Sequence, residues 1–472
     1  MERIVPFTSL LFQDTISTPE MRKVWSEDNL LQKWMDVEIA ITKAQAQLGM
    51  IPREAAKEIC SNLSLEILTA EKIAQKKKTV GHIFVAFLKT FRKLCGPAAE
   101  HFHVGPTTQD ILDTGLTLMI RESHDIIMSA TFELAETLCA RALKHKNTLV
   151  MGRTHQQHAV PTTFGFILAI WASEIMDHIQ RAISSENRWL FGNLSGVVGA
   201  QNSFVELSDI DTARKIQELV CTELGLKTPV IDLHTRIDRF SEITNNLCGL
   251  SGSLGKIGLN IREWQRPEVM EVEEPYKDTY YSSTAAPHKR NPESSEIVEG
   301  LAMVSSGLSS AMQTLRMPAT RDSTRIPVEF TCIPLIYMMT ARAIKTTQNN
   351  IAGLAVHADK MRYNVNHPNV LNQAASERIM LSIYKKTGAK DKAHTRLHDL
   401  AAESSKRCMP FKQVILNDNQ ISAIIPLEEL DELMDLSTYT GTAARQTIEA
   451  VNLIREKLNF NKKKHDSISS ET

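Results

Sequence analysis

The residues best suited to chemistry lie together between Tyr280 and Glu296, in the segment YYSSTAAPHKRNPESSE. Pro287 and Pro292 disfavour a helix across the polar residues between them. A segment with so few apolar side chains gains little by packing, so its hydroxyls and cations are available to an anionic ligand. A solvated basic turn would have the same composition, and the segment alone leaves both readings open. Its polar groups are Ser282, Ser283, Thr284, His288, Lys289, Arg290 and Asn291.

A second polar segment, EHFHVGPTTQD, precedes a long helical pattern. Gly105 and Pro106 interrupt the chain there, and Thr107 and Thr108 place two hydroxyls at the expected start of the helix. Backbone N–H groups at a helix N-terminus, with hydroxyls beside them, bind carboxylates. An ordinary threonine cap would use the same residues, so binding and capping both remain open here.

A third polar cluster lies in MGRTHQQHAVPTTFG, from Met151 to Gly165. Gly152 and Pro161 bracket the cluster at a point where two long helices must turn. It consists of Arg153, His155, Gln156 and His158. One more histidine, His82, stands alone near apolar neighbours, and such histidines are more often packed or surface residues than catalytic ones.

Long helices must position these clusters. Apolar residues recur every three or four positions from about Asp110 to His145 without a proline, which is typical of a bundle or coiled-coil helix. A further helix is expected near Leu30–Leu48, and two amphipathic helices flank Gly388. More long helices are expected at about Thr163–Glu186, Asp209–Leu224, Arg239–Arg266, Ser294–Leu315 and Glu329–His357. The pattern predicts an all-α fold.

The length of 472 residues exceeds what one ordinary hydrophobic core accommodates. We expect three helical domains: an N-terminal one over 1–110, a central long-helix bundle over 111–358 with a loop at 266–292, and a C-terminal one over 359–460. The polar residues 461–472 are expected to be a disordered tail.

Composition and charge exclude several kinds of partner. The 54 Lys and Arg against 55 Asp and Glu give a net charge of −1, which argues against a nucleic-acid partner. The seven cysteines show no CxxC pair, which argues against a zinc site and indicates a reducing cytoplasm. The most apolar run, Phe164–Ala172, is too short to span a bilayer, and residues 1–12 lack the apolar core of a signal peptide. No glycine-rich nucleotide-binding motif occurs.

The segment from Ser282 to Pro292 resembles the signature loop GSSxMPxKxNP of the aspartase/fumarase superfamily. Ser282 replaces the family glycine and Ala286 replaces the family methionine. The block GRTHxQxAxPTTFG is matched in full within Met151–Gly165, and GPTTQD is similar to GxTSxD. Leu194–Ala200 resembles a glycine-rich turn of the family, and the region after His357 resembles the C-terminal domain of the adenylosuccinate lyase branch. The resemblance covers essentially the whole chain.

This resemblance implies a β-elimination that releases fumarate from a substituted succinate by C–N or C–O cleavage. The family base corresponds to Ser283, the family acid to His155, and the carboxylate that supports the acid to Glu296. No metal or cofactor takes part. The positions that contact the small dicarboxylate substrate correspond to His82, His103, Thr107, Thr108, Thr154, Gln156, Arg236, Thr284, Lys289, Asn291 and Arg321.

The resemblance also implies a homotetramer in which each active site takes its blocks from three subunits. A physical argument agrees, because a helix of 30 residues is roughly 45 Å long and one subunit cannot easily gather blocks carried at opposite helix ends.

Four positions disfavour a nucleotide substrate. Adenylosuccinate lyases hold the AMP phosphate with an Arg-Tyr pair, and also with a Ser and an Arg that follow the arginine corresponding to Arg321. The corresponding residues here are Thr15, Ile16, Ile326 and Phe330. Apolar side chains cannot replace charge-assisted contacts to a phosphate without a large loss of affinity.

The segment from Phe7 to Asn29 is more similar to 3-carboxy-cis,cis-muconate cycloisomerases, although bacterial members of that group generally carry Trp at the position of His155. Arg236 replaces a family glutamine and would either bind a second acidic group of the substrate or pair with Asp238. We therefore expect a fumarate-releasing lyase. The alternatives are a cycloisomerase, an adenylosuccinate lyase and a catalytically silent structural member of the family.

Overall fold

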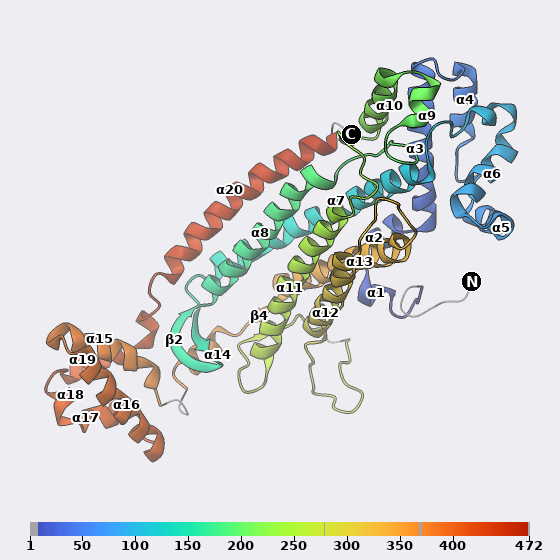
Figure 1. Cartoon of the computed structure of the whole chain (residues 1–472). Helices are drawn as coiled ribbons and strands as arrows, with labels where there is room; N and C mark the ends of the chain where they lie inside the picture. Colours follow the sequence, from blue (N-terminus) through green and yellow to red (C-terminus); the bar gives the residue numbers. More distant parts are fainter. Residues whose placement is uncertain (1–7, 278, 368–370, 471–472) are drawn as a thin grey trace.

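Helix α7 (Thr108–Lys144) is the longest in the fold and runs through the centre of the molecule (Figure 1). The computed structural model describes residues 8–277, 279–367 and 371–470. The 37 residues of α7 correspond to a length of about 55 Å. A capping interaction begins the helix: the backbone N–H of Thr107 donates to Oδ2 of Asp110 at 2.8 Å. Most residues of α7 are buried, as its uninterrupted apolar pattern predicts.

Four more long helices pack with α7 as a bundle, and the expected positions of all five are confirmed within a few residues. These are α8 (Phe164–Trp189), α11 (Asp238–Gln265), α12 (Glu293–Thr314) and α13 (Arg325–Gly353). The expected loop at 266–292 joins α11 to α12. Among the described residues, no helix is long and apolar enough to cross a membrane.

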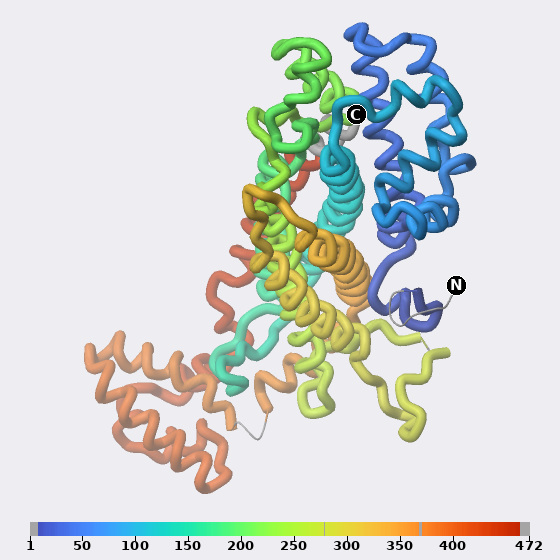
Figure 2. The backbone as a smooth tube through the Cα atoms, turned by 45° about the vertical axis from the view of Figure 1, so that its right-hand side comes forward, coloured from blue at the N-terminus to red at the C-terminus, as the bar shows by residue number. Residues whose placement is uncertain are grey.

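The N-terminal helices lie beside one end of the bundle (Figure 2). They are α1 (Gln13–Ile16), α2 (Pro19–Val24), α3 (Glu27–Gln47), α4 (Arg53–Asn62), α5 (Ala70–Val80), α6 (Ile83–Cys95) and η1 (Gly96–His101), and α9 (Asn202–Leu207) and α10 (Ile210–Glu223) lie near them. Trp34 of α3 packs on Gly115 of α7, where a Cβ would lie only 3.0 Å from the indole. Buried residues of this region, such as Phe87, belong to the same hydrophobic core as the bundle. The expected domain 1–110 therefore shares its core with its neighbour.

A second hydrophobic core lies at the opposite end of the molecule. Its helices are α14 (Ala358–Val365), η3 (Gln373–Ala375), α15 (Ser376–Thr387), α16 (Lys390–Arg407), α17 (Phe411–Leu416), α18 (Asn419–Ser422), α19 (Leu427–Met434) and η4 (Leu436–Thr438). Gly388 ends α15 with a φ of +68°, which suits glycine and confirms the expected division into two helices. Leu149 and Met151, from a strand outside this region, also contribute to this core.

Helix α20 (Ala443–Ser470) corrects two expectations about the C-terminus. It packs on α8 and α7 rather than within the second core, and Val451 and Leu458 are buried in the core of the bundle. Residues 461–470 are helical rather than disordered, because no glycine or proline follows Gly441 and lysine favours a helix. Residues 471–472 lie outside the described part. We propose that the C-terminal unit covers 359–442 rather than 359–460.

The few strands form two small antiparallel pairs. Strands β1 (Leu149–Thr154) and β2 (Gln157–Thr163) form a hairpin between α7 and α8, and β3 (Val272–Glu273) pairs with β4 (Ala355–Val356). The guanidinium of Arg153 donates two hydrogen bonds, of 2.7 and 2.8 Å, to the buried carboxylate of Glu271. This ion pair attaches the hairpin to the start of the loop after α11.

Candidate active site

A cavity of about 250 Å³ lies at the N-terminus of α7. Four of the predicted substrate-binding residues line it, namely His82, Thr107, Thr108 and Arg321. His82 also caps α6, since its Nδ1 accepts from the backbone N–H of Val85 at 3.3 Å. The structure therefore brings together residues from three distant parts of the sequence. Ile326, which is expected to stand at the position of a phosphate-binding serine in adenylosuccinate lyases, lines the same cavity and is 44% exposed.

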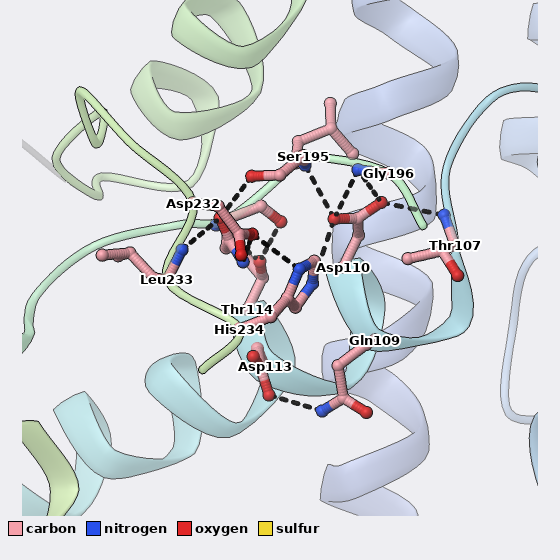
Figure 3. A network of polar contacts seen from close by, with 12 residues as sticks. Thr107, Gln109, Asp110, Asp113, Thr114, Ser195, Gly196, Asp232, Leu233 and His234 are labelled. Atoms are coloured by element: carbon pink, nitrogen blue, oxygen red, sulfur yellow. Dashed lines mark hydrogen bonds and ion pairs between the residues drawn. The ribbon is translucent and has the colours of Figure 1, made fainter. Parts of the chain in front are cut away.

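A buried polar network lies behind this cavity (Figure 3). Asp110 accepts hydrogen bonds from the backbone N–H groups of Ser195, at 2.8 Å, and Gly196, at 3.1 Å. His234 is fully buried between two carboxylates: its Nε2 lies 3.3 Å from Asp110 and its Nδ1 lies 2.7 Å from Asp232. Both contacts are ion pairs between an imidazole nitrogen and a carboxylate oxygen.

These two carboxylates determine the charge of His234. Burial by itself would lower its pKa, but Asp110 and Asp232 outweigh burial and raise the pKa to about 9. His234 is therefore an imidazolium at neutral pH. Sequence reasoning missed this residue and selected its neighbour Arg236. The exposed guanidinium of Arg236 pairs with Asp238 at 3.2 Å, which is one of the two roles expected for it. The signal available was the histidine of HTRIDR, which is flanked by Asp232 and Asp238.

Arg325 is a second polar residue that sequence reasoning missed. Its buried guanidinium lies at the cavity and forms ion pairs with Asp113 at 2.6 Å and Glu329 at 2.9 Å. It also donates to the backbone oxygen of His234 at 3.0 Å. Arg325 therefore connects α13 to α7 and to the segment that carries His234.

His103 does not line the cavity, unlike the other predicted residues of this region. Its Nδ1 lies 2.6 Å from the fully buried Oε1 of Glu38, and its ring lies 5.3 Å from that of Phe84. Burial lowers the pKa of His103, but Glu38 outweighs burial and raises it. The backbone φ of +58° is also rare for a residue other than glycine. In this chain His103 is packed against α3.

The turn of the β1–β2 hairpin presents His155. Thr154 and Gln157 are paired across the strands, so His155 and Gln156 form a two-residue turn with φ values of +51° and +61°. Turns of this kind usually contain Asn-Gly or Gly, because side chains disfavour positive φ. Backbone strain of this kind is concentrated at functional sites. Thr154, His155 and Gln156 are all exposed, so the hairpin displays them at its tip.

The loop between α11 and α12 holds Ser283 in a turn of its own. Oγ of Ser283 accepts hydrogen bonds from the backbone N–H groups of Ala285, at 3.4 Å, and Ala286, at 3.0 Å. Two N–H donors on one hydroxyl oxygen favour its ionised form. Thr284 and Lys289 are exposed on the same loop, and Glu296 is exposed in the first turn of α12.

Ser282, which replaces the family glycine, closes the base of the loop. Its hydroxyl donates to the backbone oxygen of Lys289 and accepts from the backbone N–H of Asn291. The side chain of Asn291 donates in return to the backbone oxygen of Ser282 at 2.7 Å. The glycine of the family pattern would have no hydroxyl to make these contacts. Asn291 is therefore engaged within the loop.

Replacing Ser282 by Gly should make the loop more mobile, because it removes the hydroxyl bridge and adds backbone freedom. We expect trypsin to cleave after Lys289 or Arg290 several times faster, while the thermal unfolding of the protein changes little. Mass spectrometry of a digestion time course measures this rate. Replacing the 94% exposed Tyr281 by Phe is the matched control. An unchanged cleavage rate would contradict the bridging role of Ser282.

The three predicted blocks do not meet within one chain. The cavity with Thr107 and Thr108 lies at one end of α7, and the hairpin with His155 follows the other end, about 55 Å away. The loop that carries Ser283 lies at the same end of the bundle as the hairpin (Figures 1 and 2). Thr154 and Gln156 line a separate groove of about 970 Å³ beside α8 and α11.

Comparisons with known proteins agree along most of the chain. The family model described as Lyase matches residues 13–307, and the model of the adenylosuccinate lyase C-terminus matches residues 372–450. The N-acetyl-S-(2-succino)cysteine lyase of Dickeya dadantii (strain 3937) is 35% identical over 446 residues, which cover 94% of this chain and 96% of that protein. The adenylosuccinate lyase of Methanocaldococcus jannaschii is 33% identical over 444 residues, with coverages of 93% and 95%.

The structure of 3-carboxy-cis,cis-muconate lactonizing enzyme from Pseudomonas putida is similar to this one with a TM-score of 0.86. The two proteins are 30% identical, and the match covers 95% of this chain and 100% of that one. Fold, motifs and relatives lead to one conclusion: the chain belongs to the lyase family of the aspartase/fumarase superfamily.

Proposed function

We propose that the protein catalyses a β-elimination from a small substituted succinate and releases fumarate. Ser283 removes the proton from the carbon next to one carboxylate, the bond from the neighbouring carbon to the leaving group breaks, and His155 donates a proton to that group. Glu296 supports the charged imidazole of His155. The observation that supports this role for Ser283 most directly is the pair of backbone N–H groups that bind its Oγ.

The doubly charged aci-carboxylate formed in such a reaction needs fixed donors around it. Lys289 and Asn291 on the loop, and Thr107, Thr108 and Arg321 at the cavity, are donors of the right kind. The separation of these residues along α7 supports an oligomer, and we propose a homotetramer whose subunits share each active site.

The substrate we favour is a thioether rather than a nucleotide. Ile326 places an apolar, partly exposed side chain in the cavity wall, and Phe330 is half-buried one helical turn further along α13. These side chains cannot bind a phosphate. The relative with 35% identity is named for cleavage of N-acetyl-S-(2-succino)cysteine. We therefore propose that the leaving group is the sulfur of an N-acylated cysteine, in place of the C–N or C–O cleavage expected from the motifs.

A cycloisomerase remains the second candidate because of the structural similarity to the muconate lactonizing enzyme. The two reactions differ in their products, since lactonisation is intramolecular and forms no fumarate.

To test this proposal, the purified protein is incubated under identical conditions with each of three compounds: N-acetyl-S-(2-succino)cysteine, adenylosuccinate and 3-carboxy-cis,cis-muconate. We expect fumarate to be released fastest from the thioether, as measured by its ultraviolet absorbance and by chromatography. Faster turnover of adenylosuccinate would refute the exclusion of nucleotides. Formation of a lactone would favour the cycloisomerase, and the absence of any product would favour a catalytically silent protein.

A further inference from the structure

Arg321 is held in place on several sides at the edge of the cavity. Its Nη2 forms an ion pair with Oδ2 of Asp232 at 2.8 Å. Its Nη1 donates to the backbone oxygens of Gly196 and Val197. The backbone of Arg321 has a φ of +52°, a conformation rarely adopted by residues other than glycine. These three contacts fix the position of the Arg321 guanidinium, although the backbone of this residue is strained.

The carboxylate that holds Arg321 is itself fixed. Its other oxygen lies 2.7 Å from His234, and His234 lies 3.3 Å from Asp110. Asp110 in turn accepts from the backbone N–H of Gly196, whose carbonyl oxygen faces Arg321. The contacts therefore form a closed ring (Figure 3 shows all of it except Arg321). The glycine turn packs directly on this ring, since a Cβ on Gly199 would lie 2.6 Å from Cγ of Asp232.

The charged side chains of this closed set of contacts have a net charge of zero only when His234 is protonated. The set contains two carboxylates, Asp110 and Asp232, and the guanidinium of Arg321. Each nitrogen of the His234 imidazole lies beside a carboxylate oxygen, so both nitrogens carry a proton. The side chain of His234 is therefore an imidazolium. Two cations then face two anions. Because these four side chains are neutral as a set, they do not cancel the attraction of the remaining Arg321 donors for an anionic ligand.

We propose that Asp232 and His234 are positioning residues for substrate binding that act through Arg321. They hold the guanidinium so that its unused N–H groups face the cavity lined by Thr107 and Thr108, where one carboxylate of the substrate binds. The inference rests on the proposed function, because it requires a dicarboxylate in this cavity. Asp232 does not line the cavity, and His234, which does, is buried between the carboxylates of Asp110 and Asp232.

A double-mutant cycle separates this role from a purely structural one. We expect Asp232→Asn to raise the KM for the substrate and the inhibition constant of fumarate roughly tenfold, with kcat nearly unchanged. Arg321→Gln should have a similar or larger effect. The double variant should be no worse than Arg321→Gln alone, because Asp232 then has no guanidinium to hold. Glu242→Gln, which breaks an exposed ion pair with Arg188, is the control and should change neither constant.

Additive effects of Asp232→Asn and Arg321→Gln would overturn the inference, and so would a loss confined to kcat. Arg321→Lys tests the same contact if Asp232→Asn does not fold, because lysine cannot donate to Asp232 and Val197 in the same geometry. An unchanged KM in that variant would also overturn the inference. The proposed function fails separately, when the wild-type protein releases no fumarate from any substituted succinate.

Discussion

We expect the replacement of Ser283 by Ala to lower kcat by about 10²- to 10⁴-fold, the loss typical of removing a general base. Only one oxygen disappears, and the residue is half-buried in a loop rather than in either core. The free energy of unfolding and the oligomeric state should therefore stay close to those of the wild-type protein. Fumarate release in single-turnover experiments measures the chemical step directly.

Tyr281→Phe is the control for this loop, since Tyr281 is 94% exposed and should tolerate the change with full activity. If Ser283→Ala retained wild-type turnover, Ser283 would not be the base. A loss of activity accompanied by dissociation of the oligomer would point to a structural role instead.

Replacing His155 by Gln should also reduce turnover by about 10²- to 10⁴-fold, because the leaving group then departs without a proton donor. The exposed position of His155 at the hairpin tip means that stability should change little. A second result follows from the proposed homotetramer, in which the loop and the hairpin of one active site come from different subunits. Mixing the inactive Ser283→Ala and His155→Gln proteins, dissociating them and reassembling them should restore part of the activity.

This recovery is expected because a mixed oligomer can combine an intact loop from one subunit with an intact hairpin from another. Each variant taken alone through the same dissociation and reassembly is the control, and neither should regain activity. If the mixture stayed inactive while mass spectrometry detected mixed oligomers, Ser283 and His155 of each active site would come from the same chain.

The sequence predicted the helical scaffold well because long helices depend on local spacing. The repeat of three and four from Asp110 to His145 needs no information from elsewhere in the chain, and α7 begins and ends within a few residues of these positions. The polar blocks were also recognisable, since their glycines, prolines and hydroxyls are close neighbours in the sequence.

What could not be predicted depends on contacts between distant residues. The charge of His234 could not be predicted, because it depends on Asp110, which is distant in the sequence but lies beside His234 in the fold. The hairpin turn at His155 and Gln156 was hidden because neither residue favours positive φ. Helix α20 lies on the bundle because it packs against α8. No local pattern in the sequence of α20 indicates which helix it packs against.

Leu149 and Met151 of β1 belong to the second core, although the same strand leads to His155. The hairpin that carries the proposed proton donor therefore packs against the second core as well as against the bundle. Inhibitor design gains an allosteric target from this arrangement. A compound that binds among the helices of the second core would displace His155, the proposed acid, without competing with substrate. Substitutions in that core could change the rate of catalysis without altering any residue of the cavity.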